Sequence, residues 1–351
     1  GRDLFSAVQA WVGHWPGGLA VATILSCGLF AAISGSSVAT AATIGTVAIP
    51  EMVNRGYDRR FVYGLLAAGG TLGILIPPSI PMIVFGFVAE ESVIALFLAG
   101  IGPGLLLVTF FIGFSMIYAR FSNQYKQMPK ASWLERKKST KRALPSVTLA
   151  VLIIGGLYSG AFTPTEASAV GFVAAVIITA FWLRRLTWKS FWEAVKESAV
   201  TTTAILIIIA AAKVFGKALA LYRVPQDISA FIAMNIDGPI IFILIVSAVL
   251  LVMGLVFETL SMILIMTPVL LPAAMGLGFD PIWFGIYMVI MVECALITPP
   301  VGLNLYVIQS VAKVSLGEVA SGVWPFLIMM LVCVFVLYIV PDLALYIPFK
   351  W

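Results

Sequence analysis

Long runs of apolar residues follow one another along the chain, and this pattern predicts helices that lie in a lipid bilayer. The runs are continuous Leu, Ile, Val, Ala and Phe, without the alternation over about ten residues that marks an outer-membrane barrel. Because backbone in lipid must satisfy its own hydrogen bonds, such runs fold as helices. The runs predicted to cross the bilayer without interruption are 93–120, 143–160, 165–183, 198–222 and 318–340.

Other apolar stretches carry an interruption near their middle. Residues 17–53 and 239–275 each hold two apolar pieces, both marginally short for a full span, around a small tip, and we interpret them as re-entrant hairpins. Residues 60–89 and 281–311 each contain a Pro-Pro pair, and proline both lacks an amide donor and blocks a helix. They are therefore predicted to be broken helices, each meeting the hairpin tip of its own half.

Two short stretches, Arg2–Trp15 and 225–236, precede the hairpins and mix apolar with polar residues at helical spacing. We interpret them as interfacial helices that lie along opposite membrane surfaces. Ordinary connecting helices are the alternative.

The chain repeats itself when it is shifted by 222 positions. Four of the five prolines between Val47 and Leu105 then fall on a proline: Pro50 on Pro272, Pro77 on Pro299, Pro78 on Pro300 and Pro103 on Pro325. Proline is about one residue in twenty in average proteins, so chance is a poor explanation. We therefore divide the chain into repeat 1 (1–142) and repeat 2 (143–351).

Repeat 2 contains scaffold spans between 143 and 222 for which repeat 1 has no counterpart. A complete repeat crosses the membrane an odd number of times, so the second copy is inverted relative to the first. By the same count, we expect roughly 80 further residues with about three spans ahead of Gly1. The predicted fold class is an all-α polytopic membrane protein with two inverted-topology repeats, re-entrant hairpins and broken helices.

Composition agrees with this class and excludes others. Of the residues, 61% are hydrophobic and 11% are charged, which would leave very large apolar patches on a soluble domain. The basic segments 120–142 and 184–197 lie between apolar runs, so the positive-inside rule predicts cytoplasmic loops there and a periplasmic C-terminus. The rule also accounts for the net charge of +5 without a nucleic-acid partner.

The helix interruptions are the candidate sites, because backbone groups freed in lipid are costly unless they are bound. Free carbonyls and hydroxyls suit Na⁺, whereas the N-termini of half-helices favour a carboxylate. The candidate sodium ligands are Ser34, Gly35, Ser37, Pro77, Thr259, Ser261, Thr298 and Gly302. The candidate substrate-binding residues are Ser36, Ser79, Glu258 and Asn304. The alternative is that these Ser and Thr side chains only pack and hydrogen-bond between helices.

Two acids lie at membrane depth, where acidic residues are functional candidates. For Glu258, at a hairpin tip, we favour contact with substrate or charge balance at the cation over a structural hydrogen bond. For Glu293 the two roles are equally open. An intramembrane enzyme that uses Glu258 or Glu293 as a base, or a passive anion channel, is the alternative class. Duplicated breaks argue against this enzyme, and the presence of a single histidine, His14, makes histidine-based catalysis improbable.

At these motifs the sequence resembles the large membrane subunit, the DctM-like M subunit, of tripartite ATP-independent periplasmic (TRAP) transporters. The resemblance covers essentially the whole chain. The matching segments are 30–37 (FAAISGSS), 67–79 (AAGGTLGILIPPS), 162–167 (FTPTEA) and 298–304 (TPPVGLN).

The resemblance implies sodium-driven secondary uptake of an organic acid anion across the bacterial inner membrane, with no enzymatic activity. Such an anion is a C4-dicarboxylate, a sialic acid or another sugar acid, delivered by a periplasmic substrate-binding protein. It also implies a small membrane subunit as partner, and an elevator motion in which hairpins and broken helices slide against a scaffold. The sequence alone supports a mobile core without choosing between an elevator and a rocking motion.

Overall fold

A computed structural model describes residues 1–121, 125, 127–235 and 238–350, and every regular element in these ranges is a helix. Lys126 of the predicted basic loop and Ile236 of the predicted interfacial helix fall outside the described residues. The helices are α1 (Arg2–Val12), α2 (Gly18–Ser34), α3 (Ser37–Asn54), α4 (Arg59–Leu75), α5 (Ile80–Ala89), α6 (Val93–Phe121), α7 (Trp133–Tyr158), α8 (Pro164–Ile177) with a π-helical turn (Ile178–Trp182), α9 (Trp188–Leu221), α10 (Val224–Asn235), α11 (Pro239–Met253), α12 (Thr259–Gly276), α13 (Pro281–Ile297), α14 (Leu303–Ala312), α15 (Leu316–Ile339) and α16 (Asp342–Lys350).

Helix bounds recur at the shift of 222 positions. The bounds of α3 and α4, shifted by 222, are those of α12 and α13. The same shift carries α1, α2, α5 and α6 onto α10, α11, α14 and α15 to within a few residues, and α7 to α9 and α16 are unmatched. Local capping explains part of this agreement, because Asp58 and Asp280 occupy equivalent positions and cap α4 and α13. The inverted membrane orientation of the two halves stays a prediction.

The two segments predicted as basic loops are partly helical, which corrects their bounds. Helix α7 begins at Trp133 because Ser132 and Glu135 form a capping box, with the Ser132 amide 2.8 Å from the Glu135 carboxylate. Helix α9 begins at Trp188, where the Thr187 hydroxyl accepts a hydrogen bond from the Ser190 amide at 3.1 Å. The capping residues determine where these two helices begin, whereas the high charge of the two segments had suggested loops. Several of the basic residues, among them Arg136, Lys137 and Lys189, therefore lie within the first turns of these helices.

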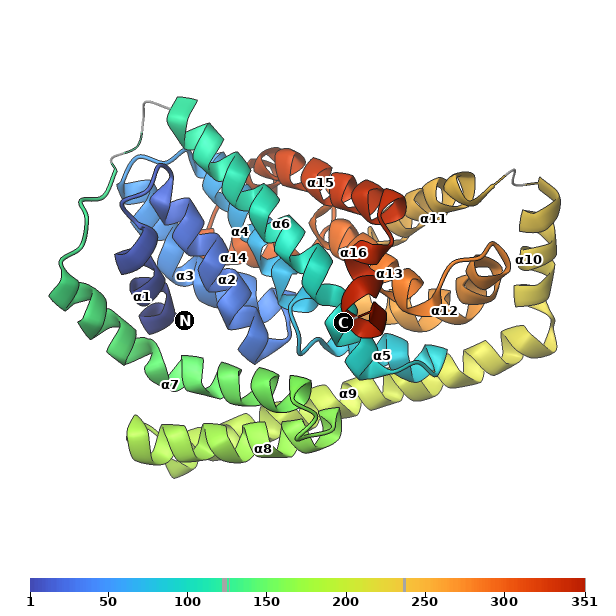
Figure 1. Ribbon diagram of the computed structural model, residues 1–351, viewed down its shortest axis with the longest axis horizontal. Helices are drawn as coiled ribbons and strands as arrows, with labels where there is room; N and C mark the ends of the chain where they lie inside the picture. Colours follow the sequence, from blue (N-terminus) through green and yellow to red (C-terminus); the bar gives the residue numbers. More distant parts are fainter. Residues whose placement is uncertain (122–124, 126, 236–237, 351) are drawn as a thin grey trace.

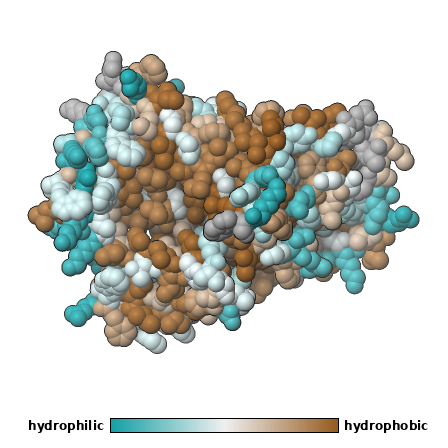
Figure 2. All heavy atoms as spheres, viewed as in Figure 1, coloured by the Kyte–Doolittle hydropathy of each residue, from teal (hydrophilic) through white to brown (hydrophobic). Residues whose placement is uncertain are grey.

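Helices α7, α8 and α9 run along one side of the bundle formed by the other helices (Figure 1). Helix α9 has no buried residue, and one of its contacts with the bundle places the Lys213 ammonium 4.4 Å from the centre of the Phe87 ring. Apolar side chains cover the middle of the face drawn in Figure 2, and hydrophilic side chains gather toward its two ends. An apolar middle between two hydrophilic ends is the distribution expected of a protein that spans a bilayer.

Six of the described helices are long and apolar enough to span a bilayer, and the bent pair α4 and α5, at 44°, adds a seventh candidate. The chain is therefore an all-α polytopic membrane protein. Helices α4 and α15 approach each other closely in the core. A side-chain carbon added at Gly64 would overlap the Gly322 carbonyl, and one added at Gly322 would overlap the Arg60 carbonyl. The two backbones approach closely because neither position carries a side chain.

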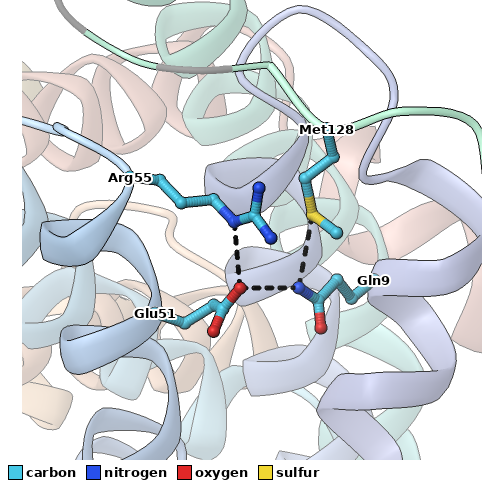
Figure 3. Close-up of polar contacts among 4 residues, drawn as sticks. All are labelled: Gln9, Glu51, Arg55 and Met128. Carbon is cyan, nitrogen blue, oxygen red and sulfur yellow. Dashed lines mark hydrogen bonds and ion pairs between the residues drawn. The ribbon is translucent and has the colours of Figure 1, made fainter.

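A polar cluster lies at the open end of the hairpin that α2 and α3 form, away from the hairpin tip. The Glu51 carboxylate accepts hydrogen bonds from the Arg55 guanidinium at 3.0 Å and from the Gln9 amide at 3.4 Å (Figure 3). Gln9 also lies 3.3 Å from the Met128 sulfur (Figure 3). The cluster joins α1, α3 and the segment between α6 and α7, and it neutralises the charge of Arg55.

Candidate functional site

The first hairpin tip lies against the break between α4 and α5. Gly35 has φ +59°, a left-handed conformation that glycine adopts without penalty. A side-chain carbon at this position would lie 2.8 Å from the backbone oxygen of Pro78. Glycine is therefore required at this position for two reasons. It adopts the left-handed turn without strain, and it leaves room for the close approach to the Pro77-Pro78 break.

Hydroxyl groups within this tip bond to one another and to the start of α3. The Ser36 hydroxyl accepts a hydrogen bond from the Ala39 amide at 3.4 Å and caps α3. The Ser34 hydroxyl lies 3.0 Å from that of Thr40, which donates to the Ser36 carbonyl at 2.8 Å. Thr40 was not predicted as a site residue, although its position four residues after Ser36 places it on the adjacent helical turn.

The second hairpin tip is capped by an acid. The Glu258 carboxylate accepts hydrogen bonds from the amides of Leu260 at 2.7 Å and Ser261 at 3.3 Å, which satisfies the first turn of α12. Ser261 thus contributes its amide to the tip. The side chain of Glu258 remains exposed, so the carboxylate is also accessible from outside the helix.

The two tips line one cavity of about 120 Å³. Gly35, Ser36 and Ser37 come from the first tip, and Glu258 and Thr259 come from the second. Apolar residues from α3, α4, α5, α12 and α14 complete the wall: Val38, Ile74, Ile80, Pro81, Leu260 and Leu303. We predicted two facing pairs, each within its own repeat. The structure adds a cavity between the repeats, in which α3 and α12 both present their N-terminal ends.

The remaining predicted residues lie outside the lining of this cavity. Ser79 is buried and caps α5, accepting a hydrogen bond from the Met82 amide at 3.4 Å. The Thr298 hydroxyl donates to the Cys294 carbonyl at 2.7 Å within its own helix. Pro77 is buried in the first break, and Gly302 is the residue that precedes α14.

Asn304 connects the repeats in the core. It is fully buried, and its amide nitrogen donates to the Ala67 carbonyl of α4 at 3.2 Å. Since a carbonyl only accepts hydrogen bonds, this contact fixes the orientation of the amide. The Asn304 side-chain oxygen is then buried without a hydrogen-bond partner among the described residues. An orphaned buried acceptor of this kind fits a bound cation.

Glu293 is also fully buried, in α13, and does not line the cavity between the tips. Neither of its carboxyl oxygens has a hydrogen-bond partner in the described part of the chain. Within that part, no group of three or more His, Cys, Asp or Glu side chains is arranged to hold a metal ion.

The geometry of the cavity suits a cation and an anion together. The N-terminal end of α3 carries partial positive charge and favours an anion, whereas the Glu258 carboxylate already occupies the N-terminal end of α12. Hydroxyl and carbonyl oxygens of the tips, together with the Glu258 carboxylate, favour a hard cation. The described lining contains no Lys or Arg, so helix ends or a bound cation must balance the charge of an anion.

The fold and this cavity define a polytopic α-helical membrane protein with its candidate site at helix interruptions. Residues 1–343 match the family described as tripartite ATP-independent periplasmic transporter, DctM component. The chain belongs to this family, and it is a transport subunit of the membrane and not an enzyme.

Three relatives illustrate the range of the similarity. The C4-dicarboxylate TRAP transporter large permease protein DctM of Pseudomonas aeruginosa is 42% identical over 99% of this chain and 81% of its own length. The isethionate TRAP transporter permease protein DctMQ of Oleidesulfovibrio alaskensis is 36% identical over 98% of this chain and 54% of its own length. The sialic acid TRAP transporter large permease protein SiaM of Vibrio cholerae is 34% identical over 98% and 81%, respectively.

Proposed function

We propose that this chain carries out sodium-coupled uptake of an organic acid anion across the bacterial inner membrane. A periplasmic substrate-binding protein delivers the anion, and a small membrane subunit completes the transporter. The names of the three relatives described above support an acid as the substrate, since they specify C4-dicarboxylate, isethionate and sialic acid; two further relatives are named for ectoine, a zwitterion that also carries a carboxylate. The observation that carries the proposal is the cavity shared by the two hairpin tips.

Sodium is assigned to the oxygen-rich side of the interruptions. The Asn304 side-chain oxygen supports this assignment most directly, because it is buried with no donor among the described residues. The hydroxyl groups of Ser34 and Thr40, 3.0 Å apart, provide further oxygens at the first tip. A bound sodium ion would satisfy these acceptors and bring positive charge toward the site of the anion.

The anion is assigned to the cavity itself, against the helix ends that Ser36 and Glu258 cap. A carboxylate there gains from the partial positive charge of the α3 end, while Glu258, which already caps the α12 end, repels it unless a cation lies between. Binding of the anion thus depends on binding of the cation. This dependence is the physical basis for coupling.

Transport also requires that the site reach both sides of the membrane. We assign the scaffold role to α7, α8 and α9 and the moving role to the hairpins and broken helices, in an elevator motion. The position of α7 to α9 along one side of the bundle, where α8 packs only on α7 and on its own π-helical turn among the larger helix contacts described, supports this division. Helix α9 supports it further, since none of its residues is buried.

Uptake in proteoliposomes tests the function. The transporter is reconstituted with its small subunit, the binding protein is added outside, and uptake of labelled succinate or N-acetylneuraminate is followed. We expect accumulation above the external concentration with an inward sodium gradient and none with an equal potassium gradient. Equal uptake under both gradients would remove the coupling, and uptake that stops at equal concentrations would indicate a passive channel.

A substitution at Asn304 tests the cation site. Asn304→Leu keeps the approximate volume and removes the orphaned oxygen together with the hydrogen bond to Ala67, so we expect the sodium concentration for half-maximal uptake to rise about 10- to 100-fold. Gln309→Leu is the control, because it removes an amide from the same helix that leaves no buried side-chain atom without a partner among the described residues. Equal sodium dependence in the two variants would contradict the assignment of Asn304.

A further inference from the structure

A second cavity, of about 520 Å³, lies at the other end of α3 from the hairpin tip. Its walls come from the second half of α3, the first turns of α4 and the end of α14. Repeat 1 supplies Thr46, Arg59 and Tyr63, and repeat 2 supplies Lys313. The positive-inside rule assigns this end of the molecule to the cytoplasmic side.

The charges of this cavity are uncompensated. Arg59 and Lys313 both line it, both are exposed, and neither forms an ion pair with a described residue. Arg55, four residues before Arg59, differs because Glu51 neutralises it at 3.0 Å (Figure 3). The acid that acts electrostatically on the cavity residue Tyr63 is Glu318, and Glu318 is not part of the lining. The cavity thus offers an anion two basic side chains that have no ion-pair partner among the described residues.

The opposite wall of the cavity is apolar. Ile49, Pro50, Val53, Val311 and Val314 lie beside the basic residues. A small free anion would use only the basic part, whereas an amphiphile would contact both parts. Basic pockets between membrane helices on the cytoplasmic side suit anionic lipid headgroups for this reason.

We propose that this cavity is an anion-binding site for the phosphate headgroup of an anionic phospholipid in the cytoplasmic leaflet. Arg59 and Lys313 bind the phosphate oxygens, and an acyl chain packs along the valine and isoleucine wall. Because Arg59 belongs to repeat 1 and Lys313 to repeat 2, the lipid joins α4 to the end of α14. The proposal does not depend on sodium coupling or on the identity of the transported acid.

A lipid titration of the purified protein in mild detergent tests the site. The thermal unfolding midpoint is followed with short-chain phosphatidylglycerol, short-chain phosphatidylcholine and inorganic phosphate. We expect phosphatidylglycerol to raise the midpoint saturably and phosphatidylcholine to leave it unchanged. At about fivefold in affinity for each basic residue, Arg59→Gln with Lys313→Gln should weaken phosphatidylglycerol binding about 30-fold.

The matched control removes two charges elsewhere on the same side. Lys137→Gln with Lys138→Gln lies in the exposed first turns of α7 and should leave the affinity within about twofold of the parent. Saturable stabilisation by inorganic phosphate that is lost in the Arg59 and Lys313 variant would assign the site to free anions and overturn the lipid assignment. Equal losses in both double variants would overturn the site itself.

Thiol labelling provides a measurement that leaves the basic residues in place. Thr46 lines the cavity and is exposed, whereas Cys27, Cys294 and Cys333 are buried and give little background. We expect phosphatidylglycerol to slow maleimide labelling of Thr46→Cys several-fold and phosphatidylcholine to have no effect. Identical labelling rates in the two lipids would overturn the proposal.

Discussion

Replacement of Gly35 by alanine tests whether the first hairpin tip rests on the helix break. Two costs add at this position. The left-handed backbone, φ +59°, costs a residue with a side chain about 1–2 kcal/mol. The new carbon would lie 2.8 Å from the Pro78 oxygen, a backbone atom that cannot rotate away, and such overpacking costs about 1–3 kcal/mol. The expected loss of stability is therefore about 2–5 kcal/mol.

Gly278→Ala separates the two costs. Gly278 has φ +89°, and a side-chain carbon there would meet no atom within 4 Å. This variant should therefore lose only the conformational part, about 1–2 kcal/mol. Gly155→Ala, at a helical position with nothing within 4 Å, carries neither cost and serves as the baseline.

The assay is thermal unfolding in detergent, measured for the three variants side by side. The midpoint should fall most for Gly35→Ala, less for Gly278→Ala and not at all for Gly155→Ala. Uptake by Gly35→Ala should also fall, because the clash moves the tip that carries Ser36 and Ser37. Equal midpoint losses at Gly35 and Gly278 would refute the contact between the tip and the Pro78 carbonyl.

Three further predictions concern the second tip, the core and pH. Glu258→Gln should lower sodium-dependent uptake at least about tenfold, and Glu258→Asp, which keeps the charge, should restore part of it; equal uptake by both would contradict a role for the charge. Gly322→Ala should lower the unfolding midpoint strongly through its overlap with the Arg60 carbonyl, whereas Gly317→Ala, with open space around it, should not. Burial, with a smaller contribution from Asp280, raises the pKa of Glu91 above its usual value. The charged form is thus disfavoured in the fold, so Glu91→Gln should raise the midpoint at pH 8 and leave it unchanged at about pH 3, where the carboxyl is protonated in both states.

Local signals in the sequence predicted much of the fold. Proline pairs and capping residues act over a few positions, so the helices observed in the predicted hairpins and broken helices begin and end within a few residues of the predicted bounds, while the re-entrant course in the membrane stays a prediction. The starts of α7 and α9 were wrong because segments of high charge were assigned to loops. The Ser132 and Glu135 capping box shows that a charged segment can begin a membrane helix.

The candidate site was less predictable, because it depends on contacts between distant parts of the chain. Nothing local indicates that the tip at Ser36 and the tip at Glu258 line the same cavity, or that Asn304 bonds to Ala67. The hydroxyl of Thr298 illustrates the alternative expected for such residues, since it bonds to its own helix. Some hydroxyl groups near a break therefore bond to their own helix, and others line the candidate site. Contacts between distant parts of the chain determine to which group a residue belongs.

The repeats share a backbone pattern but differ in the side chains at equivalent positions. Ser36 in repeat 1 corresponds to Glu258 in repeat 2, and both cap the helix that starts at their tip. Two identical tips would place like groups across the cavity, and like charges there would repel each other. The unlike pair instead gives the cavity a neutral hydroxyl side and an acidic side, as the proposed binding of an anion together with a cation requires. The duplicated breaks thus set the geometry of the site, and the differences between the copies set its chemistry.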